Sequence, residues 1–371
     1  MIVAGSVAQR PHHGGHAWVF LQYLLGFRRL GFDVLFLDRL EPDMDADESH
    51  VRVLAALMER FGLGDSWALL LDGGQEMAGR PRSEVVETAR RSVLLLNVMA
   101  YLDDDEILAA APLRAFLDID PGFGQMWHEL GLAEPFRGHD RHVTVGLRVG
   151  APDCAVPTCG IDWITTPPPV ELAEWPAGRG HGRTFTSVVS WRGPFGPIEF
   201  GGRRYGLRVH EFRRFLELPT LTGVPLEVAL DIDDADRADA ERLEQHGWKL
   251  VDPRAAAGDP WRYRDYVRSS LGEIMIAKNL YVDTRSGWFS DRSACYLASG
   301  RPALVQDTGL DGLLPLGEGL LTFSTPEEAA TGMETITRDY DRHSAVAREI
   351  AEEYFAAERV LPRLLGELGV G

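Results

Sequence analysis

The sequence predicts an α/β protein built from two Rossmann-like, doubly wound domains that face a cleft, with long helices at the C-terminus. Apolar, strand-like runs alternate with helical segments over most of the chain. A proline-rich stretch near residue 168 interrupts this alternation about midway. The length of 371 residues suits two domains, since one domain usually takes roughly 100–200 residues.

The N-terminal domain is expected over residues 1–167. A strand at 1–8 leads through a Gly-rich loop at 9–15 into a helix that Gly31 stops, and a strand at 32–38 follows. This strand, loop, helix and strand form the unit from which parallel sheets are built. Further strands are expected at 67–72, 92–97, 114–120 and 142–147.

Residues 168–182 are expected to form a linker, because prolines and glycines concentrate there. The C-terminal domain, at 183–340, begins with a strand, and the α/β pattern then continues. From Pro326 onwards apolar residues recur at helical spacing, so residues 341–371 are expected to form C-terminal helices. The elements expected at the start of this domain are strands at 184–191, 226–233 and 248–253 and helices at 207–218 and 236–247.

Composition excludes several functional classes. Hydrophobic residues make up 45% and charged residues 25%, which is typical of folded globular proteins. The formal charge of −18, from 38 basic and 56 acidic residues, argues against a nucleic-acid or anionic-membrane partner. No apolar run approaches the roughly 20 residues of a membrane helix, and the N-terminus lacks the pattern of a secretory signal. We therefore expect no membrane span and a cytoplasmic location.

Three cysteines, Cys154, Cys159 and Cys295, form neither an even framework nor a CxxC pair. A disulfide scaffold and a zinc ribbon are both disfavoured, so ordinary thiols and no metal site are expected.

The loop before the first helix is the first candidate site. Gly14 and Gly15 immediately precede the helix, where free backbone N–H groups and the helix dipole suit a phosphate. The loop lacks the GxGxxG and GxxxxGK[ST] patterns, which disfavours NAD binding and P-loop chemistry. Its histidines, His12, His13 and His16, suit proton transfer near neutral pH. The alternatives are a purely structural turn and, less favoured without accompanying carboxylates, a metal site.

The segment 284–309 is the second candidate site. Gly287 allows a tight turn, Ser290 suits a helix N-cap, and Gly300 suits a helix end. Hydroxyls, backbone donors and Arg292 at a helix start can bind a diphosphate, while Asp291 can accept a hydrogen bond from a ribose or sugar hydroxyl. The alternative is a capped helix with an exposed salt bridge.

Two acidic strings follow predicted strands. Asp118 and Asp120 precede a Pro-Gly turn at the end of an N-domain strand. Asp120 there faces the predicted cleft, where it could orient a catalytic histidine or bind an acceptor, the alternative being a turn-forming role. The second string, at 231–236, precedes a helix and suits capping carboxylates.

Two segments carry a resemblance to a known family. The first segment contains, in this order, a strand, the PxxGGH sequence at 11–16, an amphipathic helix and LGFDV at 30–34. The other is SDRSACYLASGRPALVQDTG at 290–309, which parallels the EAMACGRPVV segment of bacterial glycosyltransferases of the GT-B fold. The resemblance implies that the C-terminal domain binds a nucleotide-sugar donor, that the N-terminal domain binds an acceptor, and that the last helix returns towards the N-terminal domain.

The resemblance also implies which residues bind each substrate. Retaining members of the best-known such family carry two glutamates eight residues apart, and here Gly287 and Cys295 occupy those positions, which disfavours a retaining mechanism. The expected donor-binding residues are Gly14, Gly15, Trp191, Arg192, Lys278, Ser286, Gly287, Ser290, Asp291 and Arg292, and the expected acceptor-binding residues are His16, Asp118 and Trp127. For two of the donor-binding residues there is an alternative: Trp191 could belong to the core, and Lys278 could be a solvated charge.

These observations predict a glycosyltransferase that moves a hexose or deoxyhexose from a nucleoside-diphosphate sugar to a small acceptor such as a natural product. We expect it to act as a monomer or homodimer without metal or other cofactor. If the reaction inverts, His13 is the expected general base, with Asp120 as the second catalytic residue and His12 and His16 as competitors. The alternatives are a nucleotide-sugar 2-epimerase and a non-catalytic protein that binds a nucleotide sugar.

Overall fold

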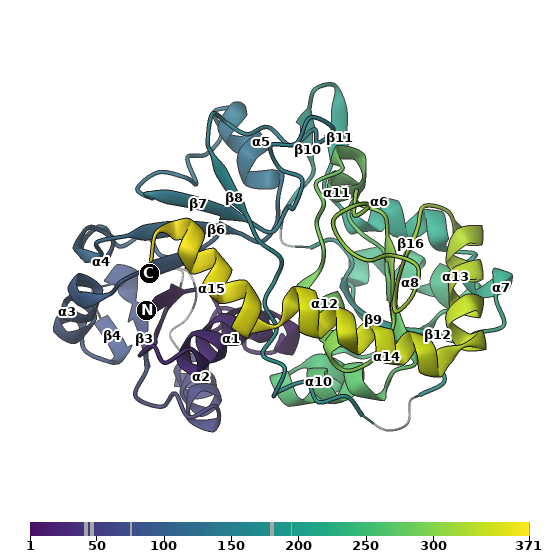
Figure 1. Ribbon diagram of the computed structural model, residues 1–371, viewed down its shortest axis with the longest axis horizontal. Helices are drawn as coiled ribbons and strands as arrows, with labels where there is room; N and C mark the ends of the chain where they lie inside the picture. Colours follow the sequence, from purple (N-terminus) through teal and green to yellow (C-terminus); the bar gives the residue numbers. More distant parts are fainter. Residues whose placement is uncertain (41–43, 45–47, 75, 179–181, 194, 371) are drawn as a thin grey trace.

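The protein folds into two α/β domains placed side by side (Figure 1). The structure, a computed structural model, describes the chain except residues 41–43, 45–47, 75, 179–181, 194 and 371. Each domain contains one mainly parallel sheet with helices packed against it, so the predicted fold class is confirmed.

The N-terminal sheet has eight strands in the order β4-β3-β2-β1-β5-β6-β7-β8. All neighbouring pairs are parallel except β3 and β4. The chain order reverses between β1 and β5, so the loops that follow these two strands diverge and leave a crevice. The strands are β1 (Ile2–Ala4), β2 (Leu35–Arg39), β3 (Trp67–Leu71), β4 (Glu76–Gly79), β5 (Leu95–Val98), β6 (Arg114–Asp118), β7 (Arg141–Thr144) and β8 (Trp163–Thr165). The helices are α1 (Gly14–Arg29), α2 (Glu48–Arg60), α3 (Arg82–Arg91), α4 (Asp105–Ala110) and α5 (Phe123–Glu129).

The C-terminal sheet has six parallel strands in the order β13-β12-β9-β14-β15-β16, and its chain order reverses between β9 and β14. The strands are β9 (Phe185–Ser190), β12 (Leu226–Asp231), β13 (Lys249–Val251), β14 (Gly272–Met275), β15 (Ala303–Gln306) and β16 (Leu320–Phe323), with a separate hairpin of β10 (Ile198–Phe200) and β11 (Arg203–Tyr205). The helices are α6 (Arg208–Phe212), α7 (Leu218–Leu221), α8 (Arg237–Gln245), α9 (Pro253–Ala257), α10 (Pro260–Ser269), α11 (Asn279–Thr284), α12 (Asp291–Ala298), α13 (Pro326–Arg338), α14 (Tyr340–Ile350) and α15 (Ala357–Leu368).

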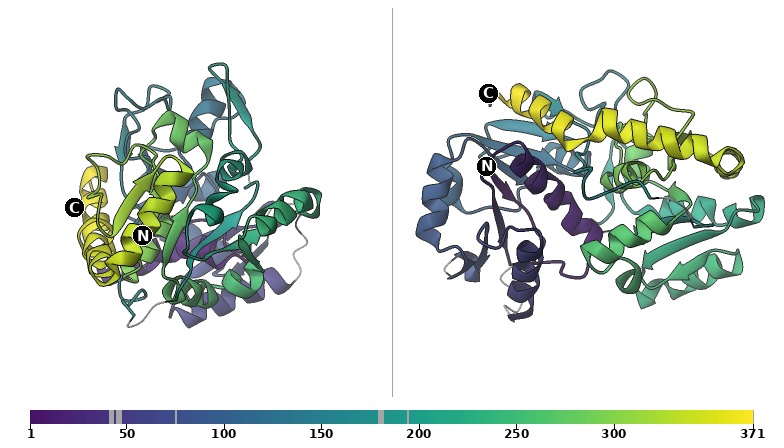
Figure 2. Two further views of the ribbon diagram at one scale, coloured as in Figure 1. Left: turned by 90° about the vertical axis from the view of Figure 1, so that its right-hand side faces the viewer. Right: turned by 60° about the horizontal axis from the view of Figure 1, so that its bottom comes forward.

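The chain passes between the domains twice, and the two crossings lie together. Val170 and Ala356 pair as an isolated parallel bridge, in which the Val170 N–H donates to the Phe355 carbonyl at 2.7 Å. After this crossing, α15 packs on α1, where a Cβ at Gly26 would lie 2.5 Å from a methyl group of Leu361. Figures 1 and 2 show α14 and α15 running along one face of the molecule from the C-terminal to the N-terminal domain.

Helix α1 begins two residues earlier than the sequence predicts, because its glycines pack against the other domain. A Cβ at Gly14 would lie 2.1 Å from the carbonyl oxygen of Asp259, and one at Gly15 would lie 2.8 Å from the ring of Tyr263. Glycine is therefore required for close approach of α1 to α10, whose N-cap is Asp259. The Trp18 indole N–H donates to the Pro260 carbonyl at 2.9 Å in the same contact.

The predicted strands at 1–8, 32–38, 67–72, 92–97, 114–120 and 142–147 overlap β1, β2, β3, β5, β6 and β7, and β2, β5 and β7 each extend one residue beyond the predicted range. The sequence prediction missed β4, β8 and the β10–β11 hairpin. Each of these strands is only three or four residues long, and none is buried along its whole length, so none produces a continuous apolar run. Among the described residues, no helix has the length and apolar character needed to cross a membrane.

Candidate active site

Two adjoining cavities lie between the domains, at the carboxyl ends of the strands. We call them the strand-end cavity, of about 420 Å³, and the central cavity, of about 250 Å³. Gly15, His16, Asp291 and Arg292 line both of them, so the two cavities meet at the start of α12. This is where open α/β sheets bind ligands, because diverging loops leave space at the switch points of both sheets.

The strand-end cavity combines apolar side chains with charged ones, including Asp231, Asp252 and Arg254. Residues 188–190 at the end of β9 and 230–232 at the end of β12 form one wall. Pro253, Ala257 and Tyr263 add apolar surface from α9 and α10, while His12 and His13 approach from the N-terminal domain. Such a mixture suits a flat heterocycle joined to a hydroxyl-bearing sugar.

The central cavity is rich in positive charge. Four cationic side chains line it, two acidic side chains oppose them, and both domains contribute. The cations are Arg10, Arg208, Lys278 and Arg292, and the acids are Asp120 and Asp291.

Lys278 and Asp120 form an ion pair across the cleft. Lys278 is the N-cap residue of α11, and its Nζ lies 2.8 and 3.0 Å from the two carboxylate oxygens of Asp120, which follows β6. The Tyr281 hydroxyl lies 3.1 Å from the same nitrogen. Burial lowers the pKa of Lys278 from its usual value, and Asp120 partly offsets this effect. Lys278 thus faces the cavity as predicted, but Asp120 pairs with a lysine rather than with a histidine.

Arg292 is held in place at the start of α12. Ser290 caps the helix as predicted, its Oγ accepting from the Arg292 N–H at 3.2 Å. The Arg292 Nε donates to Glu273 at 2.6 Å and its Nη1 donates to the Val188 carbonyl at 2.9 Å, whereas its buried Nη2 makes no protein hydrogen bond. Burial also raises the pKa of neighbouring Asp291. The start of α12 thus offers a fixed, partly unsatisfied guanidinium beside the helix N–H groups.

Arg208 is a cavity residue that the sequence analysis missed. It begins α6, lines the central cavity, and has a buried Nε without a protein hydrogen bond. Burial, together with nearby Arg292, lowers the pKa of Arg208 to about 10. The sequence signal is its place at a helix start after Gly206, and the exposed Arg213 and Arg214 just after α6 obscure it.

All three histidines line the strand-end cavity, and of them only His16 also lines the central cavity. His13 lies at the start of α1 in the strand-end cavity, with its Nε2 3.9 Å from Asp231, and burial lowers its pKa. His16 lines both cavities, but its Nε2 lies 3.0 Å from the Ser6 hydroxyl, and burial lowers its pKa to about 3. His12 lines the strand-end cavity but not the central cavity. His13 and Asp120, predicted as the catalytic residues, therefore line different cavities, which corrects their pairing.

Two residues predicted to bind the donor are placed elsewhere. Trp191 is 1% exposed, packs against Phe212, and donates its indole N–H to Asp239 at 3.2 Å, so it belongs to the core. Arg192 forms an ion pair with Asp236 at the surface and lines neither cavity. The prediction was wrong for both. At the end of β9, the Trp191 side chain points into the core and the Arg192 side chain points to the surface.

Ser286 and Gly287 hold the domains together rather than lining a cavity. The Arg148 N–H donates to the Ser286 carbonyl at 3.1 Å, and Gly287 has a φ of +67°. A Cβ at Gly287 would lie 2.8 Å from the Arg148 nitrogen, so this position requires glycine. Their predicted donor role is corrected to a domain contact.

The acceptor-side predictions Asp118 and Trp127 also lie outside the cavities. Asp118 is buried and accepts hydrogen bonds from Gln125 at 2.7 Å and Thr144 at 2.9 Å, and burial raises its pKa to about 6. Trp127 packs against Phe123 and Phe195. Asp118 therefore fixes the β6 turn that presents Asp120, and Trp127 packs behind it.

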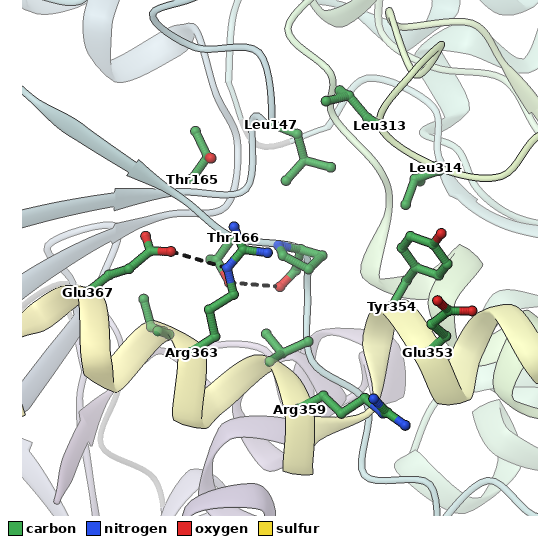
Figure 3. Close-up of a pocket in the computed structure, with 13 residues that line it drawn as sticks. Leu147, Thr165, Thr166, Leu313, Leu314, Glu353, Tyr354, Arg359, Arg363 and Glu367 are labelled. Carbon is green, nitrogen blue, oxygen red and sulfur yellow. Dashed lines mark hydrogen bonds and ion pairs between the residues drawn. The ribbon is translucent and has the colours of Figure 1, made fainter. Parts of the chain in front are cut away.

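A third cavity, of about 430 Å³, lies against α15 (Figure 3). Residues 165–167, Tyr354 and the α15 face around Val360 line it together with Leu313 and Leu314, and Arg363 is paired there with Glu367. It shares no residue with the two cleft cavities, and its two arginines are balanced by two glutamates, so it lacks the excess of positive charge of the central cavity. The candidate active site is therefore the pair of cleft cavities.

In sequence, the chain matches no protein-family profile and no curated protein. In structure, it is similar to Anabaena HepE (Alr3699) in complex with UDP-glucose, with a TM-score of 0.61 and 11% identity over 99% of this chain and 98% of that one. It is also similar to an alpha-glucosyltransferase in complex with UDP-glucose and DNA, with a TM-score of 0.56, 10% identity and the same coverage. A third similar structure is sucrose-phosphate synthase from Thermosynechococcus elongatus, with a TM-score of 0.54 and 12% identity over 99% of this chain and 98% of that one. The likeness extends over both domains and the C-terminal helices, and the chain has the GT-B fold that the sequence resemblance implied.

Proposed function

We propose that the protein is a glycosyltransferase that uses a nucleoside-diphosphate sugar as donor and a small molecule as acceptor. The observation that carries the proposal is the meeting of the two cavities at α12. A cavity with apolar and acidic side chains there adjoins a strongly cationic one, and this is the order of chemistry along a nucleotide sugar.

The nucleoside would occupy the strand-end cavity. Its base can lie against Pro253, Ala257 and Tyr263, and its ribose hydroxyls can donate to Asp291 or Asp231. The neighbours in structure bind UDP or UDP-glucose, so UDP-glucose is the first donor to test.

The diphosphate would lie where the two cavities meet. Arg292 and Arg208 line this region, each with one buried nitrogen that makes no protein hydrogen bond, and the first N–H groups of α12 add the positive end of the helix dipole. Charge-assisted hydrogen bonds of this kind contribute about 1.5–3 kcal/mol each.

The same groups would promote the reaction. As the bond between the anomeric carbon and the diphosphate oxygen breaks, negative charge develops on the leaving diphosphate, and fixed cations stabilise it. Because these cations belong to the protein, we expect turnover without a divalent metal. The central cavity of about 250 Å³ must hold the transferred sugar and the reacting end of the acceptor, which favours a small acceptor.

Calorimetric titration with UDP and with uridine tests the donor site. We expect Arg208→Ala to weaken UDP binding roughly 10–100-fold and to leave uridine binding nearly unchanged, because only the diphosphate contacts this side chain. Arg192→Ala is the matched control, since that arginine lies at the surface in an ion pair with Asp236. Failure of the wild-type protein to bind UDP, or equal weakening by both variants, refutes the proposed donor site.

Turnover is tested by UDP release from UDP-glucose with and without a panel of acceptors. Acceptor-dependent release supports a transferase. Conversion of the donor sugar without any acceptor would indicate an epimerase, and tight UDP binding without turnover would indicate a binding protein.

A further inference from the structure

The N-terminal domain has its own ligand crevice at the switch point of its sheet. Strand β1 lies between β2 and β5, so the loop after β1 and the loop after β5 separate above the sheet. Arg10 from the first loop and Tyr101 from the second line the central cavity. This wall faces the C-terminal wall that carries Arg208 and Arg292.

Arg10 has no counter-ion in the part of the chain that the structure describes, because no Asp or Glu carboxylate in that part lies within 4 Å of the Arg10 guanidinium. On the C-terminal wall, Lys278 is paired with Asp120 and Arg292 with Glu273, whereas Arg208, which is assigned to the diphosphate, has no ion pair among the described residues. A half-buried guanidinium that faces a cavity without a partner is a ready site for an anion.

Arg10 belongs to the N-terminal domain, whereas Arg208 and Arg292, the cations assigned to the diphosphate, belong to the C-terminal domain. Its charge acts on His16, whose pKa is lowered mainly by burial and further by Arg10, and it also contributes to the lowered pKa of Lys278 across the cavity. The pKa of Arg208, by contrast, responds to burial and then to Arg292. The central cavity is thus lined by cations of both domains, and Arg10 is the one that the N-terminal domain contributes.

The backbone beside Arg10 is held in an unusual conformation. Met99 and Ala100 are consecutive non-glycine residues with φ of +50° and +55°. The Asn97 side chain fixes this turn, donating to the Leu102 carbonyl at 2.8 Å and accepting from the Leu102 N–H at 3.0 Å. Left-handed backbone at two such positions is costly and commonly occurs where a site must present particular side chains. Here the turn directs Met99 and Tyr101 into the cavity.

We propose that the acceptor carries an anionic group, a phosphate or a carboxylate, which Arg10 binds at the N-terminal switch point. Tyr101, a neutral hydroxyl on the same wall, is the second polar group available to it. The acceptor is assigned rather than the donor sugar because both residues belong to the wall opposite the donor groups. This inference rests on the proposed function for the identity of the neighbouring donor site.

Binding of three probes to the full-length protein tests this proposal: glucose 6-phosphate, glucuronate and glucose, each titrated with and without saturating UDP. We expect at least one anionic probe to bind ten or more times more tightly than glucose. Arg10→Ala should remove this preference and leave UDP affinity unchanged within about twofold, whereas Arg10→Lys should retain part of it. Glucose 6-phosphate against glucuronate distinguishes phosphate from carboxylate recognition.

The controls separate this site from the donor site. With UDP bound, Arg208→Ala and Arg192→Ala should keep the preference for the anionic probe. Equal binding of all three probes by the wild type, or an unchanged preference in Arg10→Ala, overturns the inference even if UDP binds as proposed. An Arg10-dependent preference for UDP-glucuronate over UDP-glucose would overturn the acceptor assignment by placing the anion on the donor. Loss of UDP binding in the wild type refutes the donor site, while the titrations without UDP still decide the role of Arg10.

Discussion

The ion pair between Lys278 and Asp120 joins the two domains inside the cleft, and its removal should destabilise the whole protein. The Lys278 side chain is 7% exposed, that of Asp120 is 18% exposed, and the shortest nitrogen–oxygen distance is 2.8 Å. At an effective dielectric constant of about 20, two unit charges at this distance attract by about 6 kcal/mol, before the cost of desolvation. Removing one partner leaves the other charge buried and unpaired, which typically costs about 3–5 kcal/mol.

We therefore expect Lys278→Met and Asp120→Asn each to lower the free energy of unfolding by about 3–5 kcal/mol. The double variant should lose far less than the sum of the two, because no unpaired charge remains. Urea unfolding, followed by both tryptophan fluorescence and circular dichroism, measures these changes. Lys249→Met is the matched control, since its pair with Glu227 is exposed on the lysine side and should contribute at most about 1 kcal/mol. Additivity of the two single changes within about 0.5 kcal/mol would refute the reasoning.

Three further outcomes follow from the site. Treatment with EDTA should leave turnover unchanged, and its loss with recovery on adding magnesium or manganese would show that protein cations do not suffice. His13→Ala should raise the KM for the donor more than it lowers kcat, because His13 lies in the strand-end cavity; a loss of kcat of about 10²–10⁴ would instead identify it as the base. His16 binds a proton more weakly in the folded protein, with a pKa of about 3, than in the unfolded chain, near 6.5. The free energy of unfolding should therefore fall as pH drops from 6.5 towards 3, by up to about 4 kcal/mol from this group; His16→Asn should reduce that slope, and equal slopes in the two proteins would contradict the assigned burial.

Much of the fold was predictable from sequence because strand and helix periodicity are local. The Ser290 cap and the start of α12 were predictable for the same reason, and this helix start places Asp291 and Arg292 on the cleft cavities. Lys278 was predicted to face a diphosphate, but its partner Asp120 lies 158 residues away, and no local pattern joins them.

The errors and omissions have a common physical origin. Trp191 follows a strand that ends at the cleft, but whether its side chain turns into the core depends on packing against Phe212, a contact made by tertiary structure. Arg208 and Arg10 were missed because each looks like an ordinary surface arginine until the other domain closes over it. In the sequence of the first loop, the histidines beside Arg10 gave a stronger chemical signal than Arg10 itself.

The packing of α15 on α1 has a consequence for how the protein is made. The face of α1 around Gly26 is covered by residues such as Leu361, which are synthesised more than three hundred positions later. At about 5–20 residues per second, a ribosome needs on the order of 15–65 s to add them. The first domain to emerge is thus the last to be completed, and its apolar helix face has no intramolecular cover until the end of the chain arrives.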